Sequence, residues 1–343
     1  MSEVRPSGDT DGAARLAASA RDRLAFALAD LGLPDGYRLS EWQRATVSAL
    51  LERLVASVEA ELRGALAGSF AGDEGLHASL ASASVRIAMP ILDSAAPWEP
   101  ALLGALLRRA EEHRLHRGAA DHGLLIDLAG DADEAIGSAA MALLIAQSSR
   151  FDGFQEPILA RAELPAELQH LLVWTVAAAL RHYIVTSHAV APADADAAIA
   201  AAASGLLAGA DEGESFAARA LRLMRRLAAA RRLDGPLVLR SLADGSLPIF
   251  LAAVSVRSGI AAEPCWELIS DPGGRGGALL LRAAGLGKGV AAAILFRLHG
   301  ETQAIASEIG RFEAVEPDAA MRLLGLWNAD PAYRAAVARM VAR

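Results

Sequence analysis

The chain has 343 residues, a formal net charge of −8 at pH 7, and a composition that is 53% hydrophobic but only 5% aromatic. Alanine and leucine therefore supply most of the apolar surface. Both residues favour helices, whereas the residues that favour strands are sparse. The negative charge argues against a general nucleic-acid binder. The single cysteine, Cys265, excludes an intramolecular disulfide and a zinc site built from several cysteines.

The sequence contains no recognisable targeting or membrane segment. Residues 1–14 are polar and lack the apolar core of a signal peptide. The longest stretch of low charge, 189–210, contains Pro192, Asp194 and Asp196. No window therefore offers the roughly 18 consecutive apolar residues of a membrane-spanning helix. We expect a soluble protein, and a reducing cytoplasm fits the lone cysteine.

Residues 1–14 are expected to be a disordered tail, and residues 15–75 to form N-terminal helices. The first helix, 14–31, stops at Gly32. Ser40 then opens a longer helix, with Gln43 as its capping-box partner. An apolar residue recurs at every fourth position of this second helix, at Leu50, Leu54, Val58, Leu62 and Leu66. Such a stripe predicts core packing, with homodimerisation through the same face as the alternative.

Residues 76–188 consist of short helical patterns with regular breaks. The predicted helices are 79–92, 98–110, 119–129, 133–147, 154–162 and 166–187. Asp133 is the expected N-cap of the fourth of these. Helix pairs that recur every 35 to 45 residues or so are typical of HEAT-like helical hairpins.

Residues 189–213 are rich in alanine and glycine and predict a connection, although 194–207 has a composition compatible with a helix. Residues 214–343 are predicted to form a C-terminal helical domain. Its expected helices are 215–232, 236–243, 247–258, 262–270, 276–284, 287–298, 301–312, 317–328 and 331–342. No stretch of the chain alternates apolar and polar residues as a strand does. The predicted fold class is therefore all-α, a HEAT-like hairpin array followed by a second helical region.

Two groups of motifs resemble the alphaproteobacterial domain-of-unknown-function family 2336. The first group comprises RIAMPIL at 86–92, EHR at 112–114, LPAEL at 164–168, Trp174 and ALR at 179–181. The second comprises LADG at 242–245, Phe250, LISDPGG at 268–274 and LRAAGL at 281–286. The resemblance covers about residues 80–300. It implies an all-helical, HEAT-like bacterial cytoplasmic protein without an established activity, and it assigns no functional residue.

The strongest metal-binding pattern is the segment with His113, His116, Asp121 and His122. Residues three apart on a helix share a face, so the first two imidazoles could bind one ion. Arginines crowd the same segment, however, and histidines and arginines at a helix end also complement the helix dipole. We therefore predict no metal and no cofactor, and keep a metal-dependent protein or enzyme as an alternative.

An arginine-rich helix begins near residue 216. On a helical wheel Arg219, Arg222 and Arg226 line one face, beside an apolar stripe. These residues are the candidate interaction site, for an acidic protein partner, anionic lipid or nucleic acid. An ordinary solvated face is the competing interpretation, because no aromatic residues interleave with the arginines up to Arg232.

Other catalytic patterns are missing from the sequence. The segment 284–289 lacks the spacing of a phosphate-binding loop and predicts a turn between helices. Cys265 has no motif around it, and no serine elbow is present. We therefore expect a non-enzymatic protein-interaction or regulatory scaffold with an unidentified protein partner. Binding to nucleic acid or an anionic membrane through the arginine helix remains a further alternative.

Overall fold

The computed structural model describes residues 38–70, 72–82, 84–95, 98–119, 123–209 and 212–341. The predicted tail at 1–14 and the predicted helix at 14–31 lie outside the described residues, as do Asp121 and His122. Residues 42–343 form one unit, and every contact given below lies within it.

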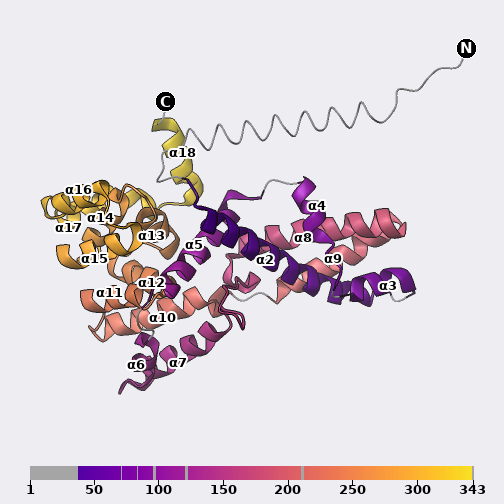
Figure 1. Cartoon of the computed structure of the whole chain (residues 1–343), viewed down its shortest axis with the longest axis horizontal. Helices are drawn as coiled ribbons and strands as arrows, with labels where there is room; N and C mark the ends of the chain where they lie inside the picture. The colour runs from indigo at the N-terminus through magenta and orange to yellow at the C-terminus, as the bar shows by residue number, and fades with distance from the viewer. Residues whose placement is uncertain are drawn as a thin grey trace, which may run out of the picture. The chain divides into compact units, whose positions relative to one another are not determined.

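The secondary structure of the described residues is helical, apart from an isolated antiparallel bridge between Phe151 and Pro157. The all-α prediction is confirmed. The α-helices are α2 (Glu41–Ala67), α3 (Glu74–Ala81), α4 (Ala88–Ala95), α5 (Pro100–Arg117), α6 (Leu124–Ala129), α7 (Glu134–Ser148), α8 (Ala166–His188), α9 (Pro192–Ala208), α10 (Phe216–Ala229), α11 (Gly235–Ala243), α12 (Leu247–Ser258), α13 (Ala262–Ile269), α14 (Arg275–Ala283), α15 (Lys288–His299), α16 (Gln303–Arg311), α17 (Pro317–Leu323) and α18 (Pro331–Val341) (Figure 1). Short 3-10 turns lie at Arg161–Glu163, Glu212–Glu214, Phe312–Ala314 and Gly325–Asn328.

The predicted helix 79–92 is divided in two, because the side chain of Arg63 satisfies the backbone between α3 and α4. Arg63 donates to the carbonyl oxygens of Leu80 at 2.8 Å and Val85 at 2.7 Å. Its charge is balanced by Glu59, one turn earlier on α2, at 3.0 Å. Both side chains are buried. A buried ion pair thus stabilises a helix break that the spacing of apolar residues does not predict.

Two other predictions of local structure differ from the structure. Residues 154–160 are not helical, because the carboxylate of Asp152 accepts the backbone N–H groups of Phe154 and Glu156 at 2.8 and 2.9 Å. This side-chain turn competes with helix formation. The predicted connection at 189–213 is largely the helix α9, which covers the run 194–207 that the sequence left open as a helix, since its alanine-rich sequence has high helix propensity.

The buried apolar side chains form two hydrophobic cores. The first core joins α2, α3, α4, α8 and α9 with the first part of α5, and Figure 1 shows α8 and α9 side by side. The second core joins α6, α7 and α10 to α16 with Leu115 near the end of α5. Helices α6 and α7, which the sequence places with the 76–188 hairpins, therefore pack with the C-terminal helices. α5 contributes to both cores.

Two carboxylates, the buried Asp244 and the half-buried Glu163, cap helices that are distant in sequence. Asp244 accepts the backbone N–H of Leu124 at the start of α6, at 2.6 Å. Glu163 accepts that of Phe216 at the start of α10, at 3.0 and 3.1 Å from its two oxygens. The N-terminus of a helix presents unpaired N–H groups and a partial positive charge, so an acidic side chain stabilises it. These two contacts fix the start of α6 and of α10.

Gly245 brings the turn between α11 and α12 into close contact with α5. Its φ is +77°, the left-handed region that favours glycine. The N–H of Gly245 donates to the carbonyl of Leu242 and that of Ser246 to the carbonyl of Ser241, which makes a Schellman cap of α11. A Cβ on Gly245 would lie 2.5 Å from the Cα of His116. Only glycine permits this approach of two backbones.

No single helix among the described residues is both long and apolar enough to cross a membrane. Only taken together do the helices α12 and α13 reach the length and apolar composition of a membrane span, and the two helices are bent by 105° relative to each other.

Candidate functional site

The two described histidines of the predicted metal segment pack against aromatic rings. The imidazole of His116 stacks on Phe151, with ring centroids 4.5 Å apart. His113 is buried and stacks on Trp42 at 6.1 Å. Burial holds the pKa of His113 below its ordinary value of 6.5; the charge of Glu156 opposes this shift, and that of Arg109 adds to it. In the part of the chain that the structure describes, no group of three or more His, Cys, Asp or Glu side chains is placed to hold a metal ion.

The three candidate arginines of α10 each make contacts within the chain. Arg219 pairs with Glu214 at 2.8 Å, and Arg222 pairs with the same carboxylate at 3.4 Å. Arg226 donates to the carbonyl oxygen of Ala135, in the first turn of α7, at 2.5 Å. These contacts tie α10 to the turn before it and to α7. The three arginines lie on α10, and their side chains bind neighbouring parts of the chain.

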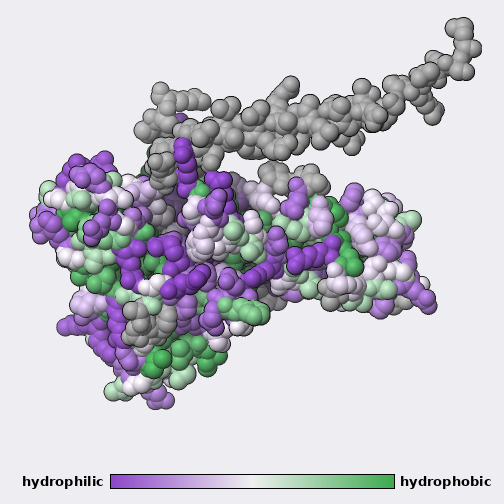
Figure 2. Space-filling model, viewed as in Figure 1, coloured by the Kyte–Doolittle hydropathy of each residue, from purple (hydrophilic) through white to green (hydrophobic). Residues whose placement is uncertain are grey.

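The outer side of the α6–α7 hairpin, which the sequence analysis did not single out, exposes large apolar side chains. Ile145 and Met141 lie one turn apart on α7 and are 66% and 45% exposed, and Ile126 on α6 is 60% exposed. The inner side of α7 places Ile136, Ala140 and Leu143 in the second core. In Figure 2 hydrophobic residues gather over the position of α7. We call Ile126, Met141 and Ile145 the hairpin face.

A network of three buried charges and one half-buried charge lies where α5 passes between the two cores. Glu112 pairs with Arg109 at 2.9 Å and with Arg150 at 2.6 Å. Arg150 in turn reaches Glu163 at 2.9 Å. Each guanidinium also lies over an aromatic ring, Arg109 over Phe151 and Arg150 over Phe216, with 4.8 and 4.5 Å to the ring centroids. We call Arg109, Glu112, Arg150 and Glu163 the charge network.

Within this network the ionised form of Glu112 is favoured. Burial alone would raise the pKa of a carboxyl group, but the charges and hydrogen bonds of Arg109 and Arg150 outweigh it and hold the pKa of Glu112 below its ordinary value. Burial lowers the pKa of Arg109, which the charge of Glu112 opposes. The charge network thus links α5 to two other segments: the residues that follow α7 and the loop that precedes α8.

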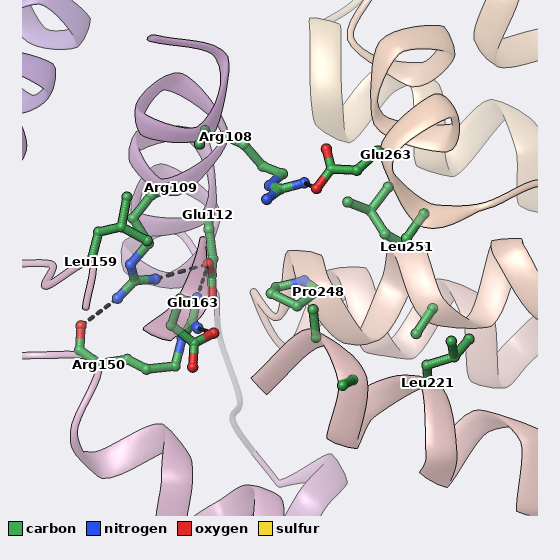
Figure 3. Close-up of a pocket in the computed structure, with 15 residues that line it drawn as sticks. Arg108, Arg109, Glu112, Arg150, Leu159, Glu163, Leu221, Pro248, Leu251 and Glu263 are labelled. Carbon is green, nitrogen blue, oxygen red and sulfur yellow. Dashed lines mark hydrogen bonds and ion pairs between the residues drawn. The ribbon is translucent and has the colours of Figure 1, made fainter. Parts of the chain in front are cut away.

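A cavity of about 200 Å³ lies beside the charge network, between α5 on one wall and α10, α12 and α13 on the other (Figure 3). Its apolar lining consists of Ala105, Leu159, Ala217, Ala218, Leu221, Pro248, Leu251, Ala252 and Ala262. Its charged lining consists of the network residues together with Arg108 and Glu263. Arg108 of α5 and Glu263 of α13 form an ion pair between the two walls.

The predicted turn at 284–289 and the predicted core position of the cysteine are both present. Gly285 has a φ of +68° at the end of α14, and Gly287 is the N-cap of α15. Cys265 is fully buried, and burial raises the pKa of its thiol to about 12. This thiol stays protonated at neutral pH and is therefore a poor nucleophile.

The model of one protein family, DUF2336, described as an uncharacterised protein conserved in bacteria, matches residues 121–325. The match covers more than half of the chain. The resemblance predicted from the sequence covers about residues 80–300. The family match therefore begins later than predicted and ends further along the chain. Its description specifies bacteria and no narrower group. No curated protein and no solved structure matches the chain.

Proposed function

The chain belongs to the DUF2336 family of uncharacterised bacterial proteins, and we propose that it is a non-enzymatic protein-interaction module of the bacterial cytoplasm. Its HEAT-like hairpins serve as a scaffold, and the hairpin face is the surface that docks a partner protein. The observation that carries the proposal is the exposure of Ile126, Met141 and Ile145 on one hairpin.

The composition of α7 supports docking at this face. The helix carries a single charged residue, Glu134, in its first turn, and its remaining positions are alanine, glycine, serine, glutamine or large apolar residues. A helix that is apolar on both sides is normally covered on both sides. The second core covers only one side of α7, and large apolar side chains left exposed together are a feature of protein-binding sites. The partner we propose is a protein that presents an apolar helix or groove.

The contacts of α10 favour the hairpin face over the arginine face. Arg219, Arg222 and Arg226 already hold neighbouring backbone or carboxylate groups. A phosphate or an acidic partner would have to displace these contacts. Docking on Ile145 and Met141 would instead cover apolar surface that is 66% and 45% exposed to solvent.

Capture of the partner from a bacterial lysate tests the proposal. We expect the purified chain to retain a specific protein, and the double variant Met141→Asp/Ile145→Asp to lose it. The control is Leu171→Asp on α8, which places a charge at an apolar residue of similar exposure (43%) outside the hairpin face. Equal capture by the double variant and the wild-type chain would refute the proposal. Light scattering on the same samples distinguishes a homodimer from a heterologous complex.

A further inference from the structure

We infer that the cavity between α5 and the helices α10, α12 and α13 binds a small, uncharged and mainly apolar organic molecule with one polar group. This ligand site is separate from the hairpin face, and nothing in the proposed protein-interaction function requires it. Its size, its lining and its balance of charges carry the inference.

The size of the cavity sets the size of the ligand. It measures about 200 Å³, and an apolar cavity of about 150 Å³ in another protein is large enough to bind benzene. The hollow exists because the facing positions on its walls are alanines, among them Ala105 on α5 and Ala218 on α10. A leucine at either position would fill much of the space. The cavity therefore fits one compact ring or a short branched chain.

The charges around the cavity exclude a charged ligand. Three arginines and three glutamates line it, and each glutamate already has a partner. Glu112 and Glu163 are neutralised within the charge network, and Glu263 is neutralised by Arg108. An added carboxylate or ammonium would have no unpaired counter-charge, and an uncompensated buried charge is strongly unfavourable.

The ion pair between the walls provides the polar contact. The side chain of Glu263 is 57% exposed and that of Arg108 is 21% exposed, whereas those of Arg109 and Glu112 are nearly inaccessible. Glu163 is 21% exposed, but its two oxygens already accept the N–H of Phe216 and it pairs with Arg150. The most accessible charged group of the lining is therefore Glu263, at the end of the cavity where it pairs with Arg108. Figure 3 shows these two side chains facing each other, with Leu251 nearby. A hydroxyl or an amide can donate to Glu263 and accept from Arg108 without carrying a charge.

Three probes of matched size test this inference with the full chain. Benzyl alcohol, benzoate and benzylammonium share one ring and differ in charge. We expect saturable binding of benzyl alcohol in a ligand-observed NMR titration at pH 7.5, and binding at least tenfold weaker for the two ions. Alanine-methyl labelling locates the bound probe, because its ring should give contacts to the methyl groups of Ala105 and Ala218.

Two filled variants, Ala105→Leu and Ala218→Leu, come from opposite walls, and both positions are only half-buried. Each should weaken benzyl alcohol binding at least tenfold while the chain stays folded. The control is Ala198→Leu, at a half-buried alanine on α9 that does not line the cavity, and it should bind as the wild-type chain does. Absence of saturable binding would overturn the inference. So would equal binding by folded filled variants, methyl contacts elsewhere, or tighter binding of either ion.

Discussion

Replacement of Gly245 by alanine should destabilise the folded chain through two separate effects. The first is conformational, because a φ of +77° is unfavourable for any residue with a Cβ, by about 1 kcal/mol. The second is steric. The new Cβ would lie 2.5 Å from the Cα and 2.8 Å from the N of His116, and 3.0 Å from the carbonyl carbon of Leu115.

The steric cost is expected to be the larger one. All three atoms belong to the backbone of α5, so no side chain can rotate away, and non-bonded carbon atoms need about 3.5–4.0 Å. Either α5 or the α11–α12 turn must therefore move by about 1 Å. Overpacking of this kind costs about 1–3 kcal/mol or more. We predict that Gly245→Ala lowers the free energy of unfolding by about 3 kcal/mol in total.

Gly259→Ala is the matched control. Gly259 also has a positive φ, +73°, but no heavy atom lies within 4 Å of the point that a Cβ would occupy there. Gly259→Ala should therefore lower the free energy of unfolding by the conformational cost alone, about 1 kcal/mol. Urea unfolding followed by circular dichroism measures both variants against the wild-type chain. Equal losses for Gly245→Ala and Gly259→Ala would refute the close approach of the α11–α12 turn to α5.

Three further predictions concern other sites. Arg231 is exposed and has a left-handed φ of 57°, which is unfavourable for a residue with a Cβ. Arg231→Gly should therefore raise the free energy of unfolding, measured in urea, by about 0.5–1 kcal/mol. A loss of stability would contradict this prediction. Glu112→Gln should cost about 3–5 kcal/mol, because it leaves the buried Arg109 without its counter-charge and Arg150 with Glu163 alone. Glu263→Gln at an exposed pair should cost less than about 1 kcal/mol, and equal urea midpoints for the two variants would be inconsistent with a buried network. The pKa of His113 is lower in the folded chain than its ordinary value of 6.5, so the unfolded chain binds more protons and stability should fall as the pH drops through 6.5. Burial also lowers the pKa of His299, which therefore contributes in the same direction. His113→Phe should reduce this dependence in unfolding measured between pH 7.5 and 5.5, and an unchanged slope would show that His113 does not contribute to it.

Much of the helical pattern could be predicted from the sequence, because its signals are local. The helix 133–147 was predicted from the apolar spacing and from Asp133, and α7 begins at Glu134 with Asp133 as its N-cap. The C-terminal predictions were similarly close, for example 247–258 for α12. Propensity, caps and breaks act within a few residues, so a single sequence is sufficient to place them.

The candidate site could not be predicted in the same way, because its contacts join distant segments. Glu112 meets Arg150, 38 positions later, and Glu163 caps α10 at Phe216, 53 positions later. One signal was present: Arg109 and His113 fall at the same spacing as Leu102 and Leu106, on the buried side of α5. Charged residues at core-facing positions indicate buried ion pairs, but their partners depend on the tertiary fold.

The hairpin face was missed for a related reason. The sequence of α7 is apolar around the helix, and only the packing of α10 against one side shows which apolar residues are left uncovered. Ile136 and Ile145 are indistinguishable by type, yet the first is 1% exposed and the second 66%. Exposure of this kind depends on the assembled helices rather than on local sequence.

Site-specific photo-crosslinking tests the docking function most directly. A benzoylphenylalanine placed at position 145 sits on the hairpin face, and one placed at position 171 sits on an exposed part of α8. Irradiation in living bacteria should yield a discrete crosslinked protein from position 145 and none from position 171. The crosslink should disappear when Met141→Asp is added to the same chain. A crosslinked product that is the same from both positions, or no product from position 145, would contradict a docking site at the α6–α7 hairpin.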